Sequence, residues 1–210
     1  MTMNHITTAT TADQPRAWVG CRACYNEGRL VGEWLDHDQL DEFCDADTAD
    51  GIAGLGCRYA ASHEETWVMD HEYFAGALEG ECSPSEALAL MGWLDEVADL
   101  FGDDVPAAVI VEYIQDDCGY QTVADVDLAN VRDAFIGVYD SAEDYAQEAI
   151  RDYLVPTPGR YGGWDTRKLQ PVLDALPDWL HIDWAWSAKE LLAGEATVEY
   201  GGKLYLFASI

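Results

Sequence analysis

Acidic residues crowd the middle of this chain, and they restrict which parts of it a fold can bury. Between residues 36 and 110 the sequence has nineteen Asp and Glu residues and one base, Arg58. The stretch from Asp36 to Asp50 alone holds seven carboxylates and no Lys or Arg. Two carboxylates about 6 Å apart in water repel by roughly 0.7 kcal/mol before salt screens them. A whole surface of such pairs opposes folding, which indicates that the charge serves a function.

The overall charge argues against several kinds of partner. The 210 residues include 40 acidic and 11 basic side chains, a formal net charge of −29. Such a chain lacks the Lys and Arg that bind nucleic-acid phosphates, and anionic membrane surfaces would repel it. We therefore expect no nucleic acid and no membrane as partner, but a basic protein or a solubilising role. Eight Trp and eleven Tyr residues make intrinsic disorder unexpected.

No segment has the pattern of a targeting or membrane-spanning sequence. Residues 1–14 lack the apolar core of a signal peptide, and the longest apolar run, 105–111, is too short to cross a bilayer. We therefore expect a cytoplasmic protein, in which the six cysteines are reduced thiols. Cys21 and Cys24 form a C-x-x-C within a predicted strand, without a second pair or a nearby histidine. We expect these thiols to be buried or half-buried, and we expect no dedicated metal site.

No catalytic motif is evident, so we expect a protein that is not an enzyme and needs no cofactor. The segments that begin at His63 and His71, HEETW and HEYFA, lack the second histidine of a zinc-protease helix. There is no P-loop, no G-x-G-x-x-G and no G-x-S-x-G. A hydrolase that uses a carboxylate pair, such as Glu64 and Glu65, is an alternative that would need a cleft and a shifted pKa. Adjacent acids are, however, expected by chance in a chain with 40 of them.

Apolar periodicity and turn signals divide the chain into a sheet-forming part, a helical part and a mixed part. The first part is predicted to contain strands at 16–25, 29–36 and 65–72, a helix at 40–46 with Leu40, Phe43 and Cys44 on one face, and a Gly- and Ala-rich loop at 46–56. In the middle, Ser83, Pro84 and Glu86 have the spacing of a capping box, which predicts a helix over 83–103. The other predicted elements are helices at 105–117, 125–135, 141–154, 165–176 and 183–194, a strand at 134–140 and a hairpin at 196–209.

Four blocks of the sequence resemble the ArdA family of antirestriction proteins. The first, at 18–36, has an extended segment, a Tyr-Asn-x-Gly turn and a Gly-x-Trp strand. Blocks at 64–72, 138–153 and 180–207 follow in the family's order as an acidic strand, a Tyr-Asp-Ser helix start and a closing helix with a hairpin. The residues that carry these motifs are Tyr25, Asn26, Gly28, Gly32, Trp34, Asp140, Ser141 and Asp183. Trp184 and Lys189 stand where the family usually has Tyr and Arg, which leaves the choice of target open.

The resemblance implies both a function and an architecture. ArdA proteins are acidic homodimers from mobile elements that mimic bent B-form DNA and block type I restriction–modification enzymes. They occupy the DNA-binding groove of the specificity and methyltransferase subunits. The implied fold is an elongated α+β chain of three small domains, here expected at 16–80, 81–133 and 134–210 after a disordered tail at 1–15. The family dimerises through its C-terminal domain, which is compatible with the near-neutral charge of residues 161–210.

On this basis we assign the acidic segment to phosphate mimicry. Carboxylates at helical i, i+3 and i+4 spacing lie about 5–6 Å apart along a rod. The predicted partner-binding residues are Asp36, Asp38, Asp41, Glu42, Asp45, Asp47, Glu64, Glu65, Asp70, Glu72, Glu86, Asp95, Glu96, Asp99, Asp103, Asp104, Asp116 and Asp117. Each is one charge among many, so no single Asp→Asn change is expected to matter much.

The charge could also arise from salt adaptation or serve an acidic adaptor. A salt-adapted surface would spread acids over the whole chain, whereas residues 161–210 carry seven acids and four bases. The uneven distribution therefore favours a functional anionic surface. An acidic adaptor or chaperone-like protein would have such a surface too, but it would bind many basic DNA-binding proteins with little selectivity.

Overall fold

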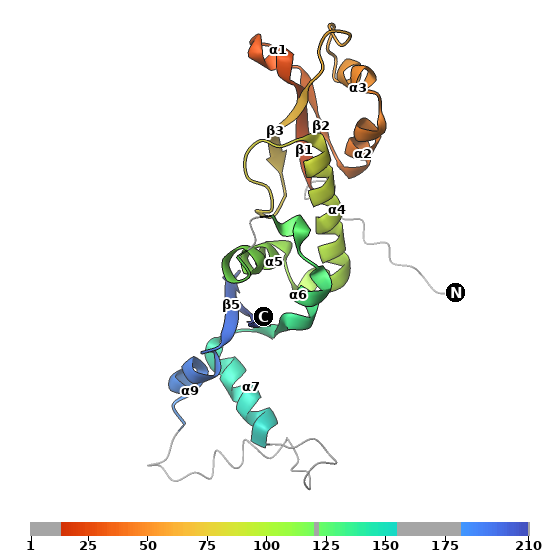
Figure 1. Ribbon diagram of the computed structural model, residues 1–210. Coiled ribbons are helices and arrows are strands. Elements are labelled where there is room, and N and C mark those ends of the chain that lie inside the picture. Colours follow the sequence, from red (N-terminus) through yellow and green to blue (C-terminus); the bar gives the residue numbers. More distant parts are fainter. Residues whose placement is uncertain (1–13, 120–121, 155–181, 210) are drawn as a thin grey trace, which may run out of the picture. The chain divides into compact units, whose positions relative to one another are not determined.

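Figure 1 shows the computed structural model, which describes residues 14–119, 122–154 and 182–209. Within these residues the protein is α+β, with two small antiparallel sheets and eight α-helices. The chain forms two compact units. The N-terminal unit holds the chain up to Gln115 and residues 120–126, and the C-terminal unit holds residues 116–119 and the chain from Asp127. The division into three domains stays a prediction, and nearly all of the predicted tail lies outside the described residues.

The sheet of the N-terminal unit has the strand order β2-β1-β3. Its strands are β1 (Arg16–Cys21), β2 (Gly32–Leu35) and β3 (Thr66–Glu72), and both neighbours run antiparallel to β1. The prediction of a strand as far as residue 25 was wrong, because the helix α1 (Arg22–Asn26) follows β1 directly. Successive strand residues point to opposite faces, so an extended chain would separate Cys21 from Cys24. One helical turn instead buries both of these side chains completely.

Two helices connect β2 to β3, where one was predicted. Helix α2 (His37–Asp45) begins three residues earlier than expected, and α3 (Thr48–Gly54) replaces the predicted loop. Leu40 is buried and Phe43 half-buried, as the predicted apolar face requires, but Cys44 is exposed. Ile52 explains α3, because this fully buried side chain anchors a segment whose own helix propensity is low.

The long helix of the N-terminal unit confirms the capping box read from the sequence. Helix α4 (Pro84–Phe101) begins at Ser83, whose side chain accepts from the Glu86 N–H while the Glu86 carboxylate accepts from the Ser83 N–H. Its apolar face, with Leu90, Leu94 and Val97, is buried. The chain continues through the 3-10 turn η1 (Gly102–Asp104), α5 (Ala107–Glu112), the π-turn η2 (Tyr113–Asp117) and the 3-10 turn η3 (Val123–Asp125).

The C-terminal unit is built on the second sheet, with the strand order β4-β6-β5. Its elements are α6 (Leu128–Ala134), β4 (Phe135–Tyr139), α7 (Ala142–Leu154), α9 (Trp184–Leu191), β5 (Glu195–Tyr200) and β6 (Lys203–Ala208). The predicted hairpin is confirmed, since Gly201 and Gly202 form its two-residue turn with φ of 59° and 77°. The helix predicted at 165–176 lies outside the described residues. None of the described helices has both the length and the apolar character needed to cross a membrane.

Candidate partner-binding surface

The acidic surface starts with the cap of α2. The Asp36 carboxylate accepts from the Gln39 N–H at 3.0 Å, and the Gln39 side-chain oxygen accepts from the Asp36 N–H at 3.1 Å. This reciprocal pair satisfies two N–H groups that an uncapped helix leaves without a partner. Asp36 therefore has a structural role as a helix cap, which was not predicted from the sequence. Its negative charge also interacts favourably with the positive, N-terminal end of the helix dipole.

Helix α2 presents a face of four exposed acids. Asp38, Asp41, Glu42 and Asp45 follow the spacing i, i+3, i+4 and i+7, which places them along one side of the helix. Leu40 occupies the opposite side and is fully buried. Among the described residues, none of the four acids forms an ion pair with Lys, Arg or His. Their charges are thus directed to solvent, without a neutralising partner in the described part of the chain.

A second group of acids lies on α4, which packs against α2. Asp95, Glu96 and Asp99 are exposed on this helix, and Asp103 and Asp104 continue the group in η1. Thus segments about fifty residues apart in the sequence bring their acids to neighbouring helices of one unit.

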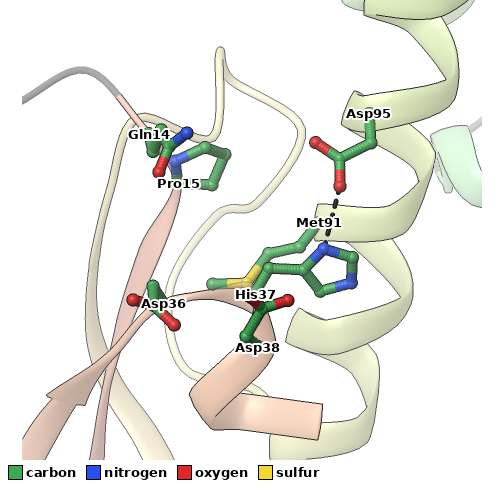
Figure 2. A pocket seen from close by; sticks show the side chains of 7 residues that line it. All are labelled: Gln14, Pro15, Asp36, His37, Asp38, Met91 and Asp95. Carbon is green, nitrogen blue, oxygen red and sulfur yellow. Dashed lines mark ion pairs between the residues drawn. The ribbon is translucent and has the colours of Figure 1, made fainter. Parts of the chain in front are cut away.

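A pocket of about 230 Å³ separates the start of α2 from α4 (Figure 2). Asp36, His37 and Asp38 line one side, while Met91 and Asp95 come from α4 and Gln14 and Pro15 complete the wall. The His37 Nδ1 atom lies 2.8 Å from the Asp95 Oδ2 atom, and this contact links the two helices. One acid of the α4 group is therefore tied to a neighbouring side chain, whereas Glu96 and Asp99 have no such link among the described residues.

Some of the predicted acids have cationic partners. The Arg16 Nε atom donates to the Glu72 carboxylate at 2.7 Å, and Arg22 forms an ion pair with Glu65 at 3.1 Å. These two carboxylates carry less uncompensated charge than those of α2. Glu86 is different, because the backbone and side-chain hydrogen bonds from Ser83 lower the pKa of its carboxyl group and keep it ionised.

Exposure alone does not select the predicted residues. Each predicted acid whose side chain is described is exposed, except the half-buried Glu72, and the side chain of Asp117 is not described. Asp116 and Asp117 belong to the C-terminal unit, and the other predicted acids belong to the N-terminal unit. Acids that were not predicted are equally exposed in the N-terminal unit, including Asp50, Glu79, Glu81 and Asp125. The free, regularly spaced face of α2 is therefore the best-defined part of the surface.

One cluster was not predicted from the sequence, that of Cys21, Cys24, Cys57 and His63. No histidine is near the C-x-x-C in the sequence, but the fold brings His63 to it, with the His63 Nδ1 atom 3.2 Å from the Cys21 Sγ atom. The spacing of 36 residues between Cys21 and Cys57 concealed this cluster in the sequence. Burial, with hydrogen bonds to Cys57 and Cys21, raises the pKa of the Cys24 thiol to about 12, so this thiol is a poor nucleophile at neutral pH.

The motif residues of the first sequence block shape the turn between β1 and β2. Tyr25 and Asn26 close α1, and Gly28 adopts a φ of 77° in the turn that follows. Gly32 begins β2 opposite Gly20 of β1, and the next but one residue, Trp34, pairs with Trp18. These residues are thus structural, and none of them belongs to the acidic face.

The motif residues of the later blocks cap and tie the C-terminal unit. Ser141 caps α7, since its Oγ atom accepts from the Asp144 N–H at 3.1 Å. Asp183 caps α9, since its carboxylate accepts from the Trp186 N–H at 3.0 Å. Asp140 pairs with Lys203 of β6, and this hydrogen bond raises the pKa of the Lys203 ammonium group. Helix caps and one long-range ion pair within the C-terminal unit therefore account for these positions.

Comparison with known proteins agrees with these motifs. The model of a family of antirestriction proteins matches residues 17–197, which is most of the chain. The protein therefore belongs to the ArdA family. A search of curated protein sequences gives no match. Membership implies antirestriction, that is, inhibition of restriction enzymes, and the members of this family are inhibitors rather than enzymes.

Proposed function

We propose that this protein is a mimic of B-form DNA that occupies the DNA-binding groove of a type I restriction–modification enzyme. It would contact the specificity and methyltransferase subunits and protect mobile-element DNA from restriction. The observation that carries the proposal is the row of exposed acids on α2, which form no ion pair within the described part of the chain, in a member of an antirestriction family. A groove lined by Lys and Arg for phosphates is the surface that such a row complements.

The charge spacing on α2 supports this proposal. Asp38 and Asp45 are seven residues apart, which corresponds to about 10.5 Å of helix axis at roughly 1.5 Å per residue. The four acids of this face therefore present one charge per about 3.5 Å of axis. One strand of B-DNA carries one phosphate per about 3.4 Å. The linear charge density of the face thus equals that of a single DNA strand.

The acids of α4 add a second group of charges beside the first. Glu96 and Asp99 are exposed on the helix against which α2 packs. Binding would bring these like charges close to cations of the partner and would relieve the repulsion within each protein. Because the charges are exposed, salt should screen the attraction strongly.

A competition titration tests the proposed function. A type I methyltransferase core would be bound to a labelled cognate duplex, and the protein would be added at several salt concentrations. We expect displacement of the duplex at near-stoichiometric protein, with weaker displacement as salt rises. Equal binding to unrelated basic proteins would favour the acidic adaptor instead. No displacement even at low salt would refute the proposal.

We also propose a homodimer formed through the C-terminal unit, on the basis of the family resemblance. Exposed apolar side chains in this unit support it, namely Trp186 with 61 % of its surface exposed, Ile136 and Val138 of the edge strand β4, Leu191 and Tyr200. Light scattering is expected to give about twice the chain mass of 23.2 kDa. Trp186→Glu should shift the protein toward the monomer, whereas Leu30→Glu, at an exposed apolar residue of the N-terminal unit, should not. Identical behaviour of the two variants would place the interface elsewhere.

A further inference from the structure

Three cysteines and one histidine converge inside the N-terminal unit from four separate segments. Cys21 ends β1, Cys24 lies in α1, Cys57 follows α3, and His63 precedes β3. Their donor atoms, three Sγ atoms and one histidine nitrogen, all lie within 4.8 Å of one another. From this geometry we propose that Cys21, Cys24, Cys57 and His63 form a structural zinc site.

The distances between the donor atoms fit a tetrahedral ion. Zinc bonds of about 2.3 Å to sulfur and about 2.0 Å to nitrogen imply tetrahedral edges of roughly 3.8 Å between sulfurs and roughly 3.5 Å between sulfur and nitrogen. Cys57 Sγ lies 3.9 Å from Cys21 Sγ and 3.5 Å from Cys24 Sγ. His63 Nδ1 lies 3.2, 3.6 and 3.3 Å from the sulfurs of Cys21, Cys24 and Cys57. All five edges are within about half an ångström of these values.

The same distances argue against a disulfide as the purpose of the cluster. A disulfide joins two sulfurs at about 2.05 Å and leaves the third without a partner. Here all three cysteines are free thiols. A disulfide also does not require a histidine nitrogen 3.2–3.6 Å from all three sulfurs, whereas Cys3His is an ordinary structural zinc ligand set.

The surroundings of the cluster also suit a metal. The three cysteines and Ile52 form a small buried cluster, and among the residues that the structure describes Ala23, Val31 and Ala60 pack against it as partly buried apolar residues. So little apolar surface contributes little stability, and zinc is one of the devices that hold together such small cores. Bound zinc would cross-link α1, the segment after α3 and the entry to β3.

Nearby groups would offset the charge of the loaded site. Three thiolates and a neutral imidazole around Zn²⁺ carry a net charge of −1. The Tyr59 N–H donates to the Cys57 sulfur, and the positive charge of Arg29 also acts on this sulfur. Arg29 is held in place over the Tyr59 ring, 5.0 Å from its centroid. Binding must release the thiol protons, so affinity should fall as the pH is lowered.

Metal analysis of the intact protein is the first test. Protein purified under reducing conditions without chelator is expected to contain about one zinc per chain, and removal of the metal should lower the melting temperature. Cobalt added to the metal-free protein should give the near-ultraviolet thiolate charge-transfer band and the intense visible bands of tetrahedral coordination. A wild-type protein that neither retains zinc nor gives this spectrum would overturn the proposal, as would a disulfide within the cluster.

Matched variants assign the ligands. His63→Cys should keep tetrahedral cobalt with a stronger charge-transfer band, whereas Cys57→Ser should weaken or abolish the spectrum. Cys82→Ser removes a cysteine that is also buried but lies outside the cluster, so it should leave the spectrum unchanged. Loss of the spectrum in Cys82→Ser, or its full retention in Cys57→Ser, would refute this ligand set. Neither spectrum nor metal content depends on the proposed antirestriction mechanism, so the two proposals can fail separately.

Discussion

Simultaneous replacement of Asp38, Asp41 and Asp45 by Asn and of Glu42 by Gln is expected to weaken inhibition of the restriction enzyme about tenfold. Each exposed charge contact contributes roughly 0.2–1 kcal/mol, so four together contribute about 1–4 kcal/mol. A factor of ten corresponds to about 1.4 kcal/mol. The competition titration at low salt measures this loss, and the salt dependence of binding should become shallower in the variant.

The fold should tolerate this replacement, because all four side chains are exposed and the cap at Asp36 is untouched. Removing like charges from one helix face is expected to leave thermal stability unchanged or slightly higher. A loss of inhibition in this variant would therefore result from the lost charges and not from unfolding.

A charge-matched control separates a localised surface from net charge. Replacement of Glu143, Glu148, Glu190 and Glu199 by Gln removes four exposed acids from the C-terminal unit. This variant has the same net charge as the first but should inhibit nearly as well as the parent. Equal losses in both variants would show that only overall charge matters, and a first variant as strong as the parent would refute phosphate mimicry by α2.

The second large effect is expected for Gly32→Ala, which should destabilise the N-terminal unit by about 1–3 kcal/mol. A Cβ atom at this position would lie 2.5 Å from the Val19 carbonyl oxygen and 2.6 Å from the Trp18 ring. The carbonyl belongs to the backbone of the paired strand and cannot swing aside. Gly20, directly opposite Gly32, is equally crowded by Trp18, at 2.5 Å. Glycine at both positions thus leaves space for the Trp18 indole ring, which lies close to Gly20 of β1 and Gly32 of β2.

Urea denaturation with Gly54→Ala as control measures this effect. Gly54 lies at the end of α3, where an added Cβ would meet nothing within 4 Å. Ala there should stabilise the helix by up to about 1 kcal/mol. If Gly32→Ala proved as stable as the parent, the close approach of β2 to β1 would not be the reason for glycine in this motif.

Features set by interactions within four residues could be predicted from the sequence. The capping box of α4 illustrates this, since the side chains of Ser83 and Glu86 each accept a hydrogen bond from the other residue's backbone N–H, whatever lies elsewhere in the chain. The glycine pair at the tip of the last hairpin is similar, because positive φ at both positions selects that turn. The exposure of the α2 acids follows as well, because an unpaired carboxylate is costly to bury.

Other features depended on contacts between distant residues. Helix α1 interrupts a stretch of good strand formers because Cys24 must return to the side of Cys21, and α3 forms because Ile52 is buried in the same small core. Cys57 and His63 reach that core from 36 and 42 residues beyond Cys21. No pattern of neighbouring residues in the sequence predicts these long-range contacts.

The sequence by itself thus determined the charge of this protein, most of its helices and strands, and its membership of a family. Each of these depends on composition or on neighbours along the chain. The tertiary structure alone decided that the acids of α2 lie beside those of α4, and which thiols share a histidine. Both depend on side-chain packing between remote segments, because the free energy that orders them arises only when those segments meet.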